Sequence, residues 1–245
     1  MPSDGPSPVP AFHPRLGPTL ITVPLFAALL ALGFWQVERL HEKTGLNAYR
    51  AERVSLPPID LPDDPAALSK VDASQLDFRR VRVQGSLVHD HELYVYEPSQ
   101  KGDAGYHVVT PLRRNAGPPL LVDRGWVPPE RKAPATRAAG EIAGTVTITG
   151  FVRRGQSRGW LTPDNDPAHD SWFWFDLPAM SKAAGIDPSA SFYLEADATP
   201  NPGGLPVGGQ TPIELPSPHL NYAITWFSLA GILAMIYFAW HRQAK

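Results

Sequence analysis

The sequence predicts an α+β protein in which two transmembrane helices flank one mostly antiparallel, β-rich extracytoplasmic domain. Two observations carry this prediction. Residues 16–37 and 220–240 contain no charged side chain, and each stretch has the roughly 20 residues that cross a hydrocarbon core of ~30 Å. Between them lie short runs of β-branched and aromatic residues, mostly separated by clusters of Gly, Pro, Asn or Asp. That pattern is typical of strands joined by turns.

Five segments are predicted in chain order. A cytoplasmic tail (1–15) precedes the first transmembrane helix (16–37), which leads into a periplasmic α+β domain (38–218). The second transmembrane helix (219–240) and a short cytoplasmic tail (241–245) follow. The first tail is rich in proline and has one arginine, so it cannot form the amphipathic helix of a mitochondrial transit peptide.

The first apolar stretch has an alternative interpretation as a cleavable signal peptide. Arg15 precedes it, and the sequence ALG at 31–33 is a weak cleavage site. However, Phe34, Trp35 and Gln36 follow where a cleavage region should hold small residues, and tryptophan at this depth is typical of an interfacial anchor. We therefore favour an uncleaved helix.

The orientation of the helices follows from the flanking basic residues. Residues 201–218 contain no Lys or Arg, whereas Arg242 and Lys245 follow the second helix, which places both termini in the cytoplasm. Basic residues after the first helix favour the opposite orientation: Arg39, Lys43, Arg50 and Arg53. They belong to a domain too long for its charges to govern insertion, so we give the second helix more weight.

The central domain changes from helical to strand-like patterning along the chain. Residues 37–54 continue the first helix, the proline-rich stretch 56–65 ends it, and a short helix is expected at 66–73. A further small helix at 177–185 ends at Gly185, and the segment 198–218 is irregular. Strands are expected at 79–88, 92–97, 105–113, 119–127, 145–153 and 191–197.

Composition and motifs exclude several functional classes. The chain has no cysteine, which excludes disulfides and thiolate metal sites. A net charge of −2 gives no reason to expect nucleic acid as a partner. The sequence has no phosphate-binding loop, dinucleotide fingerprint or G-x-S-x-G nucleophile elbow. We therefore predict no catalytic residue and no enzymatic activity.

Three motifs of the domain remain as candidates for chemistry. The sequence HDHE at 89–92 could place His89 and His91 on one strand face as metal ligands, but its position between two strand runs favours a hairpin turn. The sequence DRGW at 123–126 could bind an anion through its arginine or form a strand end, and we favour the strand end. The aromatic run SWFWFD at 171–176 is interpreted as core packing.

The membrane helices carry the most distinctive residues. On the second helix, His219, Tyr222 and Trp226 fall on one side, with His219 at the extracytoplasmic lip. The first helix ends at the same membrane surface with Trp35, Gln36 and Arg39. An imidazole is a good axial ligand for haem iron, aromatic rings pack on a macrocycle, and arginine pairs with propionates. Anchoring at the interface alone is the alternative explanation.

Several stretches, taken in order, resemble a known family. They include GFWQVERLHEK (33–43), FRRVRVQGSLVHDHELYVY (78–96), LLVDRGWVP (120–128), NDPAHDSWFWFDLPAM (165–180) and HLNYAITWFSLA (219–230). The chain resembles the Surfeit locus protein 1 family of cytochrome c oxidase assembly factors almost from end to end. It departs from the family's pattern at Ser217, where asparagine is usual, and at Asp123, where asparagine is common.

This resemblance implies a function and a site. It implies a bacterial inner-membrane chaperone, without enzymatic activity, that binds haem a and aids its delivery to oxidase subunit I. His219 is implied as the iron ligand, with Tyr222, Trp226, Trp35, Gln36 and Arg39 around the cofactor. Expected partners are subunit I, haem a synthase as a further candidate, and the lipid bilayer, with no nucleic acid. The alternative is a scaffold that stabilises subunit I without binding haem.

Overall fold

The computed structural model describes residues 14–186 and 191–242. The tail predicted at 1–15 therefore lies almost entirely outside the described residues, as does most of the tail predicted at 241–245. The chain divides into two compact units, one made of residues 1–49 with 214–245 and the other of residues 50–213. They are described separately.

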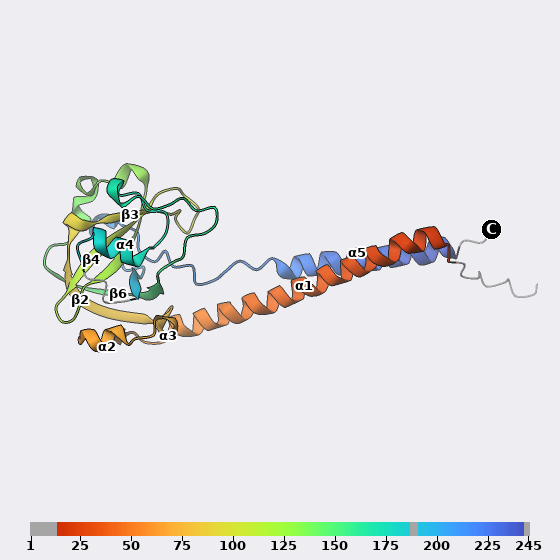
Figure 1. Cartoon of the computed structure of the whole chain (residues 1–245), viewed down its shortest axis with the longest axis horizontal. Helices are drawn as coiled ribbons and strands as arrows, with labels where there is room; N and C mark the ends of the chain where they lie inside the picture. Colours follow the sequence, from red (N-terminus) through yellow and green to blue (C-terminus); the bar gives the residue numbers. More distant parts are fainter. Residues whose placement is uncertain (1–13, 187–190, 243–245) are drawn as a thin grey trace, which may run out of the picture. The chain divides into compact units, whose positions relative to one another are not determined.

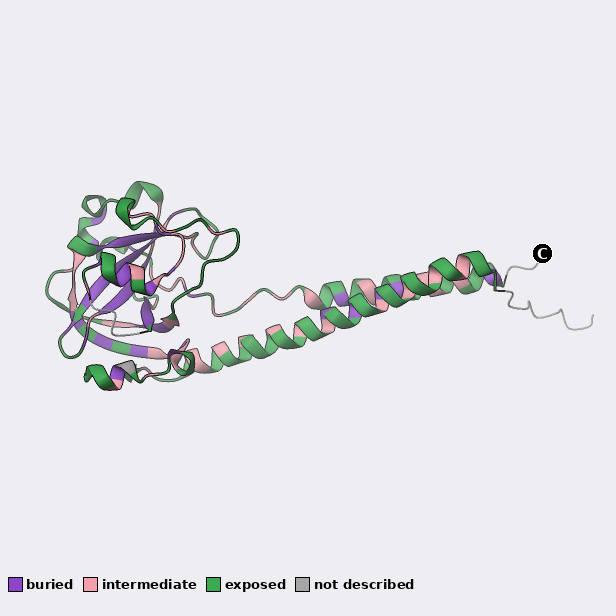
Figure 2. Cartoon of the chain, in the orientation of Figure 1, coloured by how far each residue is buried: buried purple, intermediate pink, exposed green. Residues whose placement is uncertain are grey.

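Two long helices dominate the first unit. Helix α1 spans Leu16–Ser55 and helix α5 spans His219–His241, and both are long and apolar enough to cross a membrane. With 40 residues, α1 is about 60 Å long, or twice the hydrocarbon thickness. Most of the surface of both helices is exposed in Figure 2, and only 11% of each most apolar window is buried. The predicted pair of apolar helices is confirmed, and its exposed apolar surface suits contact with lipid.

The two helices pair antiparallel to each other (Figure 1). The side chain of Asn47 donates to the carbonyl of Leu215 and accepts from its N–H. In order along the pair, contacts then join Gln36 to His219, Phe34 to Phe227, and Thr19 to Tyr237. Polar contacts therefore lie at both ends of the pair and fix its register.

Gly33 lets the helices approach closely at the middle of the pair. A Cβ atom at this position would lie 2.6 Å from the ring of Phe227, which is far inside the normal contact distance. Small residues at such positions are the usual device for close packing of membrane helices.

The second unit is built on a seven-stranded sheet. The strands are β1 (Ile59–Asp60), β2 (Arg80–Leu87), β3 (Leu93–Tyr96), β4 (Tyr106–Arg114), β5 (Leu120–Val127), β6 (Thr145–Arg154) and β7 (Phe192–Ala196), in the order β1-β2-β6-β7-β5-β4-β3. Because β2 pairs with both β6 and β4, five of the strands close into a barrel. The six predicted strands are confirmed, and the sheet is mostly antiparallel; among its described strands, β1 with β2 and β5 with β7 pair in parallel.

Short helices connect the strands. They are α2 (Pro65–Ser69), α3 (Ala73–Leu76), α4 (Leu177–Ala183), and the 3₁₀ turns η1 (His89–His91), η2 (Pro129–Arg131), η3 (Pro134–Gly140), η4 (Pro167–His169) and η5 (Pro202–Gly204). The short helix predicted at 66–73 is confirmed as α2, but its predicted extent was wrong, because it ends at Ser69 and Asp72 accepts a hydrogen bond from Ser74 N to start a separate helix. The small helix before Gly185 is confirmed as α4.

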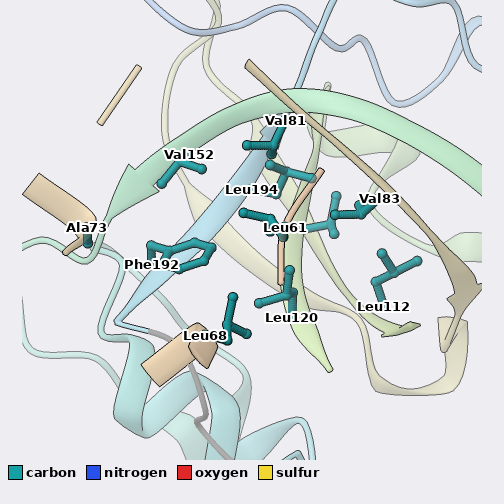
Figure 3. Close-up of a cluster of buried hydrophobic side chains, with 11 residues drawn as sticks. Leu61, Leu68, Ala73, Val81, Val83, Leu112, Leu120, Val152, Phe192 and Leu194 are labelled. Atoms are coloured by element: carbon teal, nitrogen blue, oxygen red, sulfur yellow. The ribbon is translucent and has the colours of Figure 1, made fainter. Parts of the chain in front are cut away.

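Two hydrophobic cores lie on opposite faces of the barrel wall. Figure 3 shows the inner core, where Val81, Val152 and Leu194 gather from three strands. The outer core packs Trp172, Phe175 and Met180 against the sheet, which confirms that the aromatic run at 171–176 contributes to the core. Successive side chains of a strand point to opposite faces, so Leu194 faces inward while Tyr193 and Glu195 lie on the outer face.

Candidate cofactor-binding site

A hydrogen bond between the two long helices organises the candidate site. The Nδ1 atom of His219 lies 2.7 Å from Oε1 of Gln36, and Gln36 is 8% exposed. An amide oxygen can only accept, so the imidazole donates from Nδ1, and in its neutral form Nε2 carries the lone pair. A neutral imidazole held in this way can coordinate a metal through Nε2.

Two further predicted residues lie beside His219 on α5. Tyr222 is 53% exposed and Trp226 is half-buried. The residues of α5 that are buried are Ala223, Ala230 and His241, so the two aromatic side chains lie at the flank of the helix interface. Tyr222 lies about one turn and Trp226 about two turns along the helix from His219.

The remaining predicted residues of α1 point elsewhere. Trp35 precedes Gln36 by one residue and therefore points about 100° away from it around the helix. Its half-exposed ring stacks under the guanidinium of Arg39 at 5.8 Å, and Arg39 donates to Glu42 at 2.7 Å. The structure thus joins Gln36 to His219, while Trp35 and Arg39 contact each other. A role of Trp35 and Arg39 in a cofactor site stays a prediction.

Comparison with known proteins identifies the family to which this chain belongs. A model described as the SURF1 family matches residues 23–231, which include most of both long helices and the whole barrel. The chain belongs to the SURF1 family. It is 37% identical to a SURF1-like protein of Monosiga brevicollis over 228 residues, covering 88% of this chain and 84% of that one. The Surfeit locus protein 1 of Mus musculus is 35% identical over 89% of this chain and 73% of its own. The Surfeit locus protein 1 of Homo sapiens is 34% identical over 89% of this chain and 75% of its own.

The family assignment confirms the resemblance seen in the sequence. These three relatives are eukaryotic, so a bacterial origin for this SURF1-family chain stays a prediction.

The barrel of this SURF1-family chain holds a buried ion-pair network around Glu92. This carboxylate accepts from Arg137 at 2.5 Å and from Arg124, Thr110 and Tyr94 at 3.0–3.1 Å. Burial alone would raise the pKa of Glu92, but the hydrogen bond and charge of Arg137, with the charge of Arg124, outweigh it and hold the pKa below its usual value. Both guanidinium groups are themselves nearly inaccessible.

This network explains the roles of two sequence motifs, HDHE at 89–92 and DRGW at 123–126. Residues 89–91 form the turn η1 between β2 and β3, which confirms the hairpin turn at HDHE, and His91 bonds to the carbonyl of Ala184 instead of joining His89. Potential ligand atoms of His89, Glu92 and Glu141 lie within 4.8 Å of one another. However, Arg124 and Arg137 already neutralise the two carboxylates, so the cluster is an ion-pair network without need of a metal.

The arginine of the DRGW motif is part of the same network. Arg124 is 2% exposed and donates to Glu92 and to the carbonyl of Gly140, so an external anion has no access to it. The motif forms the end of β5, as expected.

A second charged cluster lies on the outer face of β4, β5 and β7. His107 lies 2.7 Å from Asp123, and Glu195 accepts from Arg153 at 2.9 Å. Burial would lower the pKa of His107, but the charge and hydrogen bond of Asp123 outweigh it and raise the pKa to about 9. Burial, with the charge of Asp123, raises the pKa of Glu195 to about 7. Sequence analysis missed this cluster, which joins residues far apart in the chain.

These shifts predict that stability falls with rising pH. The folded state holds a proton on Glu195 between pH 4.5 and about 7, and on His107 between 6.5 and about 9, more tightly than the unfolded state does. Each group therefore loses on the order of 3 kcal/mol of stabilisation as pH rises through its window. Urea unfolding of the full chain in detergent at pH 5, 7 and 9 should show stepwise lower stability.

The matched variant for this experiment is Asp123→Asn. It removes the anion that raises the pKa of His107, so the decline between pH 6.5 and 9 should flatten in this variant. A wild-type profile that is flat or rises across this range would contradict the assignment. Below pH 4.5 the trend reverses, because Glu92 has a lowered pKa and its stabilising charge is lost as pH falls.

Proposed function

We propose that this protein is a membrane-anchored assembly factor for cytochrome c oxidase that binds haem a and aids its delivery to subunit I. Membership of the SURF1 family supports the assembly role, because related chains carry the name Surfeit locus protein 1. The protein acts as a chaperone and performs no bond-breaking reaction. Haem a synthase is a further candidate partner.

The observation that carries the haem proposal is the hydrogen bond from His219 to Gln36. It orients the imidazole and uses Nδ1 as the donor to Gln36, so Nε2 is the atom that would reach the iron. When bound, haem a supplies an iron centre that accepts this nitrogen. Trp226, Tyr222 and Trp35 would offer apolar surface to the macrocycle, and Arg39 would offer a cation to a propionate.

The proposed location is the inner membrane of a bacterium. Both termini lie in the cytoplasm and the barrel in the periplasm, as the basic residues beyond α5 indicate. The apolar surfaces of α1 and α5 contact lipid, and an uncleaved first helix is supported by its contacts with α5 from Thr19 to Gln36.

The scaffold alternative is favoured by one specific observation. The bond between His219 and Gln36 also ties the two helices together, which is a sufficient reason for a histidine at this position without any cofactor. In that case the protein stabilises subunit I alone. The discriminating experiment is the visible spectrum of the protein purified from cells that make haem a, together with oxidase activity in a deletion strain. Restored activity from a haem-free protein would favour the scaffold.

Substitutions of Gln36 test the haem proposal. Gln36→Leu removes the acceptor for Nδ1–H, so haem occupancy should fall roughly tenfold, which is typical when the partner of a ligating histidine is lost. Gln36→Glu retains an acceptor and makes it anionic, which should preserve occupancy and lower the reduction potential of the bound haem. Redox titration followed in the visible range measures both effects. If both variants match wild type in occupancy and potential, Gln36 does not hold a haem ligand.

A further inference from the structure

A cavity of about 370 Å³ lies beside the second charged cluster of the barrel. His107, Asp123 and Glu195 line it from the outer face of β4, β5 and β7, and Glu97 lines it from the segment that follows β3. The exposed residues Gln100 and Pro212 also belong to its lining, so the cavity is reached from solvent. The proposed haem site involves none of these residues.

The charges around the cavity are unbalanced. Three carboxylates, those of Glu97, Asp123 and Glu195, face two cationic side chains, His107 and Arg153. Asp123 is paired with His107, and Glu195 is paired with Arg153. Within residues 14–186 and 191–242, the carboxylate of Glu97 receives no hydrogen bond and has no ion pair. Burial raises the pKa of Glu97, and the nearby charges of His107 and Arg153, which lower it, do not outweigh burial together with the charge of Asp123.

The apolar part of the cavity wall is aromatic. The rings of Phe175 and Tyr193 are stacked, with centroids 4.3 Å apart and planes 7° from parallel, and both residues line the cavity. Phe175 and Tyr193 are 2% and 3% exposed, so only a small part of each ring faces the cavity. Apolar surface beside carboxylates suits an organic cation, because the carbon chain can lie on the apolar part while the carboxylates accept its N–H groups.

A bare metal ion fits this cavity less well. A metal needs its ligand atoms gathered around one point. Among the described residues, the group of His, Asp and Glu side chains with ligand atoms within 4.8 Å of one another is His89, Glu92 and Glu141, outside this cavity. The spread-out carboxylates of the cavity suit a larger cation with several N–H donors.

We propose that this cavity binds a guanidinium or alkylammonium group, with Glu97 as the carboxylate that accepts from it and the exposed edges of Phe175 and Tyr193 next to its carbon chain. The group comes from a basic side chain of a partner protein or from a free amine. The site is independent of haem binding at His219.

The test is calorimetric titration of the full chain in detergent with three probes. Agmatine represents a free amine, N-acetyl-arginine methylamide represents a side chain within a polypeptide, and N-acetyl-citrulline methylamide is the uncharged isostere. We expect saturable binding of the cationic probes and at least tenfold weaker binding of the citrulline compound, since its neutral head forms no charge-assisted hydrogen bond. Comparable affinity for agmatine and the capped arginine indicates a protein side chain as the natural ligand, and a clear preference for agmatine indicates a free amine.

Glu97→Gln is the decisive variant. Because Glu97 forms no hydrogen bond within the described part of the chain, this change should leave the fold intact and weaken binding of the cationic probe about tenfold. The matched control is Glu130→Gln in the exposed turn η2, which should bind like wild type. The proposal is overturned if the citrulline compound binds equally well, if Glu97→Gln binds like wild type, or if no probe binds at millimolar concentration. Binding of MnCl₂ that displaces agmatine and is lost in Glu97→Gln would also overturn it, in favour of a metal site.

Discussion

Replacement of His219 by alanine is expected to lower the haem that copurifies with the protein by more than tenfold, the largest effect of any single change at the helix pair. Coordination of iron by an imidazole is directional. The neighbouring side chains of Asn221 and Tyr222 leave the helix in other directions, so neither can replace the lost nitrogen without a shift of the backbone. The visible spectrum of the purified protein, normalised to protein concentration, measures the change.

Graded controls distinguish a ligand from an anchor. His41→Ala alters an exposed histidine of α1 that bonds to the carbonyl of Val37 within its own helix, and it should leave the haem content unchanged. Trp35→Ala and Trp226→Ala should have intermediate effects, because they remove packing area. Arg39→Ala should have a smaller effect, since its side chain is half exposed and its charge is screened by water. Equal haem content in wild type and His219→Ala would leave the scaffold function standing alone.

Replacement of Glu92 by alanine is expected to lower the free energy of unfolding by about 3–5 kcal/mol. The carboxylate is almost fully buried and accepts from two buried guanidinium groups, those of Arg124 and Arg137. Its removal leaves two positive charges inside the barrel with a single remaining carboxylate, Glu141, between them. Uncompensated buried charge is among the most destabilising changes a protein can suffer. Urea unfolding of the full chain in detergent, followed by the barrel's far-UV signal, measures the loss.

The design of this experiment separates charge from volume. Glu130→Ala in the exposed turn η2 should change stability by less than about 0.5 kcal/mol. The triple variant Glu92→Leu, Arg124→Met and Arg137→Met removes all three charges and should recover most of the loss, because apolar side chains of similar size often replace buried ion networks without cost. A loss of less than about 1 kcal/mol in Glu92→Ala would show that water enters the network.

The strands could be predicted from the sequence because their residues and turns are local signals. Runs such as LLVDRGWV carry β-branched and apolar residues over a length that suits a strand, and glycine and proline mark the turns. Closure of the barrel could not be predicted from the sequence, because the second pairing of β2 joins Gly85 to Arg114 and depends on the curvature of the whole sheet. The two parallel pairings likewise depend on how distant segments return to the sheet.

The buried charges escaped prediction for a different reason. Glu92 and Arg137 are 45 residues apart, and both lie in or beside turns, where charged residues are normally exposed, so nothing local marks them as partners. One signal was available: Asp123 and Arg124 interrupt an otherwise apolar strand on both of its faces, which indicates burial with partners.

At the helix pair, His219 and Gln36 were both predicted, but the direction of Trp35 and Arg39 depends on how α1 is rotated toward α5, which hydropathy does not specify.

The bond between Gln36 and His219 spans 183 positions of the chain, and this separation sets when the site can exist. During translation the histidine leaves the ribosome only after the entire barrel has been made. A nascent chain carrying α1 alone has Gln36 but lacks His219. It therefore cannot form this bond between the helices before the barrel is complete, and a premature stop within the barrel leaves α1 without its partner helix.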